Sequence, residues 1–335
     1  MPSVLTHYGF NKEVFDNNVD FLINNEDIYL VGAQGPDPFF FRGIVPSLKN
    51  KNVSIIRKYG SKLHKLDPSE VFFSFFKYAN ENKENKNVLY SYIFGAGLHY
   101  ILDRKIHPYV FYKTGFSDEQ KKKAKYFACH TLFETNLDVL LMHDRFNRYK
   151  VKPCEAILCD ENKVKTVSEM YGVLAKEIVK EDVINKNSFY ESYKDMIKIE
   201  NILYSKKGVK KKIVNFLFKN TPFNTMMHPL VVKDDNVIDY LNIRKKEWKD
   251  PSSEVSFNKS IYDLIDEAKE EVEAWIKIVK DSYIGLNVND KIKSFTKGLI
   301  YDGYDNKNGK MKVFDNVYER KEKNKWLLVQ KEKNI

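Results

Sequence analysis

Residues 99–107 read HYILDRKIH, and residues 130–134 read HTLFE. An α-helix turns by about 100° per residue, so side chains four and eight positions apart lie on one face. Apolar residues surround both stretches, and imidazole or charged groups on apolar helices cost free energy unless they are paired or bind a metal. The spacing therefore predicts two buried helices that share a metal site. Five side chains form the predicted set: His99, Asp103, His107, His130 and Glu134.

The types of side chain in this set suit a catalytic metal. Imidazole nitrogen and carboxylate oxygen bind zinc at about 2 Å and leave positions open for water. Cys129, Cys154 and Cys159 form no C-x-x-C pair, which argues against a structural zinc knuckle or an iron–sulfur site. A single histidine–carboxylate pair on a helix is more often a surface hydrogen-bonded pair, but the apolar flanks favour a metal here.

Three further candidates precede these helices. His7 lies in THYGF, and Asp37 lies in QGPDPFFF, where a glycine and two prolines predict a loop. His64 follows in SKLHKLDP. Each one alone also fits an ordinary surface or turn residue, so their order along the chain decides the interpretation.

That order resembles the zinc-dependent phospholipase C family, the all-α bacterial enzymes that hydrolyse phosphatidylcholine, with the S1/P1-type nucleases as more distant relatives of the same fold. The resemblance covers about residues 1–150. It implies an all-α bundle of helices with a cluster of two or three zinc ions between its core helices. Eight residues fill the ligand positions in chain order: His7, Asp37, His64, His99, Asp103, His107, His130 and Glu134.

The same resemblance implies how the ligands divide between the ions. One ion would take Asp37, His64, His99 and Asp103. A second would take His107, His130 and Glu134, and a third would take His7 and share Asp103. Asp37 is also the implied general base.

The chain departs from the family in three places. The third zinc of the family also takes the free amine of the mature N-terminal residue, whereas this chain starts with Met1 and Pro2. Removal of Met1 would leave the amine of Pro2, and an unprocessed Met1 or the loss of the third ion is the alternative. The gap between Asp103 and His107 is shorter than in the secreted phospholipases. Pro38 follows Asp37 where the choline-specific enzymes have an aromatic residue, so choline specificity is not implied.

Four other residues need an interpretation. Phe39 and Phe40 follow the loop aspartate and are candidate substrate-binding residues, able to contact an acyl chain, a head group or a nucleobase, with core packing as the alternative. His143 is expected at the surface, and His228 is expected as a packed or capping residue.

Size and composition fit a helical enzyme. A chain of 335 residues with 43% hydrophobic residues can bury a large core, and it has no long charge-free tract. We expect a phospholipase C-like helical domain over residues 1–250 and a helical extension over 251–335 on the same domain, ending in a hairpin or a loose tail. The N-terminus shows no secretory signal and cysteines are few, which predicts a cytoplasmic protein.

Helical patterns cover most of the chain. The net charge of +10 favours phosphate-bearing substrates, but the basic clusters at residues 121–125 and 206–212 are more typical of solvated helix faces. The expected helices are residues 11–25, 68–82, 89–107, 118–146, 164–180, 187–204, 208–219 and 257–283.

These features together predict a zinc-dependent phosphodiester hydrolase that acts on a phospholipid or a related phosphoester, with peripheral membrane contact as one option. A single-strand nuclease or nucleotidase on the same fold is one alternative. The other is a non-enzymatic protein that a metal stabilises, although apolar residues could give such a scaffold its rigidity at little cost.

Overall fold

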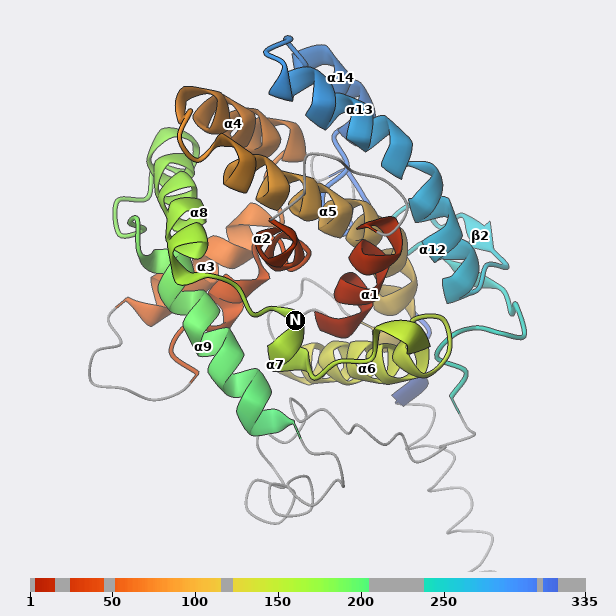
Figure 1. The fold of residues 1–335 in the computed structure, drawn as a ribbon. Coiled ribbons are helices and arrows are strands. Elements are labelled where there is room, and N and C mark those ends of the chain that lie inside the picture. The colour runs from red at the N-terminus through yellow and green to blue at the C-terminus, as the bar shows by residue number, and fades with distance from the viewer. Residues whose placement is uncertain are drawn as a thin grey trace, which may run out of the picture.

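The computed structural model describes residues 4–15, 25–44, 52–115, 123–204, 238–305 and 310–318, with the backbone alone for 123–128 and 203. The fold is all-α, as the sequence predicts, and the helices form a compact bundle (Figure 1). In chain order the elements are α1 (Val4–Phe15), α2 (Glu26–Gly32), the 3-10 helix η2 (Asp37–Phe41), α3 (Val53–Leu63), α4 (Pro68–Glu81), α5 (Lys86–Thr114), α6 (Lys123–His143), η3 (Asn147–Tyr149), α7 (Pro153–Ala156), α8 (Glu161–Leu174), the π-turn η4 (Ala175–Val179), α9 (Ser188–Leu203), β1 (Trp248–Lys249), β2 (Ser256–Phe257), α12 (Ile261–Glu270), α13 (Val272–Tyr283) and α14 (Asn289–Thr296).

Helix α5 is the centre of the bundle. It lies among the other helices (Figure 1) and contacts α1, α2, α4, α6, α8, α12 and α13. Most of its side chains are buried. The expected helix ends at residue 107, before Pro108, but α5 continues to Thr114 and ends at Gly115, whose φ is 69°. A proline inside a helix removes one hydrogen bond, and burial on every side of α5 outweighs that loss.

The N-terminal helix differs from the expected one. The sequence pattern predicts a helix over residues 11–25, of which 16–24 lie outside the described residues, whereas α1 (Val4–Phe15) already begins at Val4. The buried carboxylate of Asp138 on α6 accepts hydrogen bonds from the backbone of Leu5 at 3.1 Å and of Thr6 at 2.7 Å, which caps the first turn. His7 therefore lies on a helix whose start is fixed by α6.

The expected helix over residues 257–283 is two helices. Ser260 and Asp263 form a capping box that starts α12. The helix is interrupted at Glu271, and α13 begins at the next residue. The side chain of Glu271 pairs with Arg104 and Lys105 of α5, so the break occurs where this region is anchored to the central helix. The division into residues 1–250 and 251–335 stays a prediction.

The other expected helices correspond to α4, α6, α8 with its π-turn, and α9, while α2, α3 and α14 were not expected. Among the described residues, no helix is long and apolar enough to cross a membrane. The cytoplasmic location stays a prediction. Several expectations lie wholly or partly outside the described residues: the helix over 208–219, both basic clusters, His228, most of the C-terminal tail, and the amine of Met1 or Pro2.

Candidate metal centre

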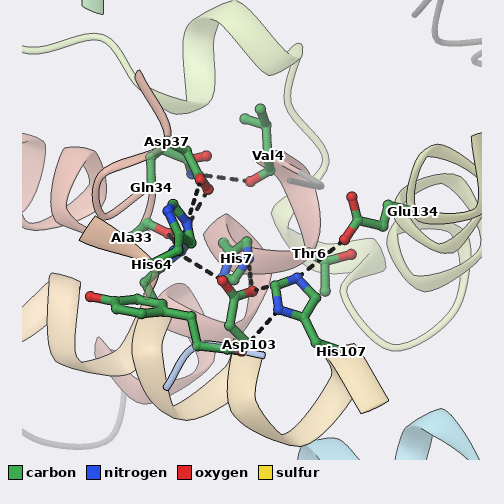
Figure 2. A network of polar contacts seen from close by, with 12 residues as sticks. Val4, Thr6, His7, Ala33, Gln34, Asp37, His64, Asp103, His107 and Glu134 are labelled. Atoms are coloured by element: carbon green, nitrogen blue, oxygen red, sulfur yellow. Dashed lines mark hydrogen bonds and ion pairs between the residues drawn. The ribbon is translucent and has the colours of Figure 1, made fainter. Parts of the chain in front are cut away.

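All eight predicted ligands come together in the interior of the bundle. Figure 2 shows His7, Asp37, His64, Asp103, His107 and Glu134 among them. His7 comes from α1, Asp37 starts η2, His64 follows α3, and the remaining five come from α5 and α6. Seven of the eight are buried. His64 is the most exposed, with 12% of its side chain accessible, so the cluster is nearest to solvent on that side.

Asp103 is the hub of the cluster on α5. Its Oδ1 lies 3.0 Å from His7 Nε2 and 3.6 Å from His107 Nε2. Its Oδ2 lies 3.2 Å from His99 Nε2. The spacing of four residues on α5 places the carboxylate of Asp103 beside His99 one turn before it and His107 one turn after it, as predicted.

Asp37 and Glu134 form the two sides of the cluster. Asp37 Oδ1 lies 3.1 Å from His64 Nε2, and its Oδ2 lies 3.6 Å from His99 Nε2. Glu134 Oε1 lies 3.0 Å from His130 Nε2 and 3.4 Å from His107 Nε2. Each carboxylate therefore faces two imidazoles.

Three sets of ligand atoms each lie within 4.8 Å of one another. They match the division that the resemblance implies, with two differences: Asp103 is absent from the first set, and His99 accompanies His7 and Asp103 in the third as well as belonging to the first. The sets are Asp37 with His64 and His99, His107 with His130 and Glu134, and His7 with His99 and Asp103.

Backbone carbonyls orient three of the imidazoles. The Nδ1 atom of His64 lies 2.8 Å from the carbonyl of Gly60, and that of His99 lies 3.1 Å from the carbonyl of Ala33. The Nδ1 atom of His107 lies 2.9 Å from the carbonyl of Tyr301. A carbonyl oxygen can only accept a hydrogen bond, so Nδ1 of each ring carries the hydrogen and Nε2 is directed toward the carboxylates, as for metal-bound histidines.

The carbonyl of Ala33 reaches His99 because α2 lies very close to α5. Gly95 on α5 contacts the backbone of α2, and a Cβ atom there would lie 2.2 Å from the carbonyl oxygen of Tyr29. Only a glycine permits this approach, which places the end of α2 directly beside the metal face of α5.

Burial and mutual attraction shift the pKa values of the cluster. Burial opposes the charged form of His107, but Asp103 and Glu134 outweigh it and raise its pKa to about 10. The same competition between burial and Asp103 raises the pKa of His7. Burial opposes ionisation of Asp103 and Glu134 as well, yet the neighbouring imidazoles keep the pKa of both carboxyl groups low. The cluster therefore holds ionised carboxylates that a divalent cation can neutralise.

The residues present fit a metal ion. Asp37 Oδ2 and His99 Nε2 are buried and make no hydrogen bond to any described residue, although both point into the cluster. Buried polar atoms rarely lack a partner, and such atoms on converging imidazole and carboxylate groups are typical of a metal site. These buried groups can hold metal ions, and their chemistry suits a divalent one.

The two candidate substrate-binding aromatics differ. Phe39 is fully buried, and its ring packs edge-on against Tyr59 and Tyr171 in the core. Phe39 therefore fits the alternative of core packing, and its contact with a substrate stays a prediction. Phe40 is half-buried, with its ring centre 5.2 Å from that of His64, so it lies at the exposed edge of the cluster.

Three site residues were missed by the sequence analysis. Asp138 lies four residues after Glu134 and continues the spacing of α6, a signal that was available. Tyr301 and Asp302 come from beyond α14, with no helical pattern to connect them to α5. Asp302 Oδ1 lies 3.8 Å from His107 Nδ1, and burial raises the pKa of this carboxyl group despite the nearby histidine. The remaining described histidine, His143, is exposed, as expected.

No family model matches this chain, and neither do the curated proteins or the solved structures compared with it. The resemblance to the zinc-dependent phospholipases C thus stays a prediction based on the eight ligand positions.

Proposed function

We propose that the protein is a zinc-dependent phosphodiester hydrolase that acts on phospholipids. The proposal is supported by one observation above all: four histidine-bearing segments and three carboxylates, far apart in the sequence, converge on one buried cluster with three candidate metal sets. The choice of zinc, and of phospholipid as the substrate, comes from the resemblance of the ligand order to the phospholipase C family.

The three sets of residues would hold two or three zinc ions. When bound, zinc neutralises phosphate oxygens, lowers the pKa of a bound water and stabilises the leaving oxygen. The protein contributes the fixed geometry of this cluster, because the carbonyls behind His64, His99 and His107 hold the imidazoles in place before substrate arrives.

Asp37 is the proposed general base. Its carboxylate lies beside His64 on the exposed side of the cluster, and Oδ2 has no hydrogen-bond partner among the described residues. A carboxylate with a free oxygen at this position can accept a proton from the water that attacks the phosphorus atom. The low local dielectric of the buried cluster strengthens each of these electrostatic contacts.

The substrate phosphate would enter beside His64. The centre of the His64 ring lies 5.2 Å from the centre of the Phe40 ring and 4.9 Å from the centre of the Tyr301 ring. These two aromatic side chains border the part of the cluster nearest to solvent. The half-buried Phe40 would provide apolar surface for the part of the substrate next to its phosphate, whereas Tyr301 is itself buried.

Hydrolysis assays on zinc-loaded protein test the proposal. The substrates are mixed micelles of phosphatidylcholine, phosphatidylethanolamine or phosphatidylserine, and single-stranded DNA and RNA. The parent and His143→Ala should release phosphorylated head groups, whereas His99→Ala should be slower by more than about a hundredfold. His143→Ala is the matched control, since the same residue type is replaced at an exposed position.

Each other outcome has a definite meaning. Cleavage of nucleic acid alone would replace phospholipid as the substrate and keep the metal-assisted hydrolysis. Zinc binding without cleavage of any of these diesters would contradict the proposed activity and favour a metal-stabilised, non-enzymatic protein. Equal rates for the parent and His99→Ala would also contradict it.

A further inference from the structure

A short turn near the end of the described chain lies against the metal helix. In residues 299–305, called here the 299–305 turn, Leu299 and Asp305 form an isolated antiparallel bridge. The backbone N–H of Ile300 donates to the carbonyl of Tyr304 at 3.0 Å, which closes the turn. The region that contains this turn lies well outside the part of the chain that carries the predicted ligands.

Gly303 fits the turn onto α5. Its φ is 82°, and a Cβ atom there would lie 2.6 Å from both the carbonyl oxygen of Arg104 and Cγ of Pro108. Pro108 has no N–H, so the carbonyl of Arg104 receives no hydrogen bond from it within the helix. The backbone of the turn packs against α5 at this carbonyl. The contact lies on α5 directly beside His107.

The turn presents two groups to the outer nitrogen of His107. The carbonyl of Tyr301 accepts a hydrogen bond from Nδ1 at 2.9 Å, and Asp302 Oδ1 lies 3.8 Å from the same atom. Nε2 of this ring faces Glu134 at 3.4 Å. His107 is thus held between a ligand carboxylate on one side and the turn on the other.

The ring of Tyr301 extends the contact to the other half of the cluster. Its centre lies 4.9 Å from that of His64 and 5.7 Å from that of His99. The carbonyls that orient those two histidines come from Gly60 and Ala33, in the N-terminal part of the chain. The outer nitrogen of His107, in contrast, is oriented from the C-terminal region.

We propose that the 299–305 turn is part of the metal centre: Tyr301 and Asp302 position His107 and thereby set the affinity of the His107, His130 and Glu134 set for its ion. Hydrogen bonds to the outer nitrogen of a ligand histidine fix its tautomer, and a nearby carboxylate increases its basicity. The proposal rests on the metal binding in the proposed function, and not on the identity of the substrate. Asp302 acts through His107 and is a positioning residue.

The first test replaces Asp302 by asparagine, which keeps its size and removes its charge. Zinc is titrated into metal-free full-length protein in competition with a chromophoric chelator. Asp302→Asn should weaken the binding of one ion by about tenfold to a hundredfold and leave the others unchanged. With cobalt in place of zinc, the visible absorption of one ion should change as well, and Asp302→Glu should restore part of the affinity.

The second test moves the turn without removing a polar group. Gly303→Ala should push the turn away from α5 and weaken the same ion. Gly298→Ala is the matched control, because this glycine has a φ of 70° but no atom within 4 Å of a Cβ placed there. Both variants carry a similar backbone strain, and only Gly303→Ala disturbs the contact with the metal helix.

The results separate this proposal from the proposed function. Parent-like affinity for every ion in both Asp302→Asn and Gly303→Ala would overturn it and make the turn purely structural. A similar loss in Gly298→Ala and Gly303→Ala would also overturn it. A parent protein that binds no zinc would refute it together with the proposed function, whereas tight zinc binding without hydrolysis would refute the activity alone.

Discussion

Two faces of α5 both carry buried polar groups, but the contacts of these groups differ. On one face, Arg104 Nη1 donates to the hydroxyl of Tyr100 at 3.1 Å and to the carbonyl of Phe295 at 3.1 Å, and its Nη2 pairs with Glu271. The guanidinium also stacks over the rings of Tyr100 and Phe295. This face fastens α5 to the C-terminal helices.

The neighbouring face carries His99, Asp103 and His107, and its polar groups converge on one another. Asp103 contacts three imidazoles, while His99 Nε2 has no hydrogen bond to a described residue. A buried charge with complete hydrogen bonding serves stability, whereas converging ligand atoms with open positions suit an ion. Two side chains next to each other in the sequence, Asp103 and Arg104, therefore have different roles.

Replacing Asp103 should have the largest effect on function. Asp103→Asn removes the negative charge and one ligand oxygen from the carboxylate that faces three imidazoles. Zinc affinity and the rate of hydrolysis should each fall by more than about a hundredfold, which exceeds the loss expected for a residue that acts through a ligand, such as Asp302. The far-UV circular dichroism should keep its helical signal. Metal counting after equilibrium dialysis checks the result, and full zinc content in this variant would contradict the role of the hub.

Replacing Arg104 should instead reduce stability. Arg104→Met removes the buried guanidinium that pairs with Glu271 and should lower the free energy of unfolding by about 2 kcal/mol, because a charge-assisted contact is lost while Glu271, 27% exposed, keeps Lys105. Metal content should match that of the parent. Denaturant unfolding of the metal-free proteins measures the change, and a variant that lost zinc while keeping its stability would reverse the assignment of the two faces.

The stabilisation by the pair of Arg104 and Glu271 should depend on pH. Burial opposes ionisation of Glu271, but Arg104 and Lys105 keep its pKa below the ordinary value of 4.5. Because the pKa of Glu271 is lower in the folded protein than in the unfolded chain, the pair stabilises the fold fully above about pH 4.5. This stabilisation is lost as the pH falls through the pKa of the folded state. The free energy of unfolding should therefore fall more steeply with acid in the metal-free parent than in Arg104→Met. Parallel curves for the two proteins would argue against this coupling.

The smallest effect is expected at Lys105. Its ammonium lies 2.8 Å from Glu271, but both side chains are 27% exposed, and solvent screens such pairs. Lys105→Met should change the free energy of unfolding by about 0.5 kcal/mol and leave the zinc content unchanged. A loss as large as that of Arg104→Met would mean that charge alone, and not burial, determines the strength of this face.

Helical spacing explains why much of the site was predictable. His99, Asp103 and His107 follow one another at intervals of four, and so do His130 and Glu134, so one rule places all five. The same interval extends to Asp138, which was overlooked. The all-α fold follows from the same patterns.

The rest depended on tertiary contacts. Residues 301 and 302 reach His107 only because the C-terminal helices fold back onto α5, and no local pattern indicates it. Phe39 and Phe40 are adjacent and chemically identical, so only the orientation of η2 assigns one to the core and the other to the site. The helix break at Glu271 likewise depends on its partners on α5.

The metal content of the chain tests the central claim most directly. It is measured by plasma mass spectrometry on full-length protein purified without an affinity histidine tag, before and after reconstitution with zinc. We expect two or three zinc ions per chain, since there are three candidate sets and two of them share His99. A chain that holds no zinc even after reconstitution would contradict the metal centre and leave the converging histidines and carboxylates as a structural cluster.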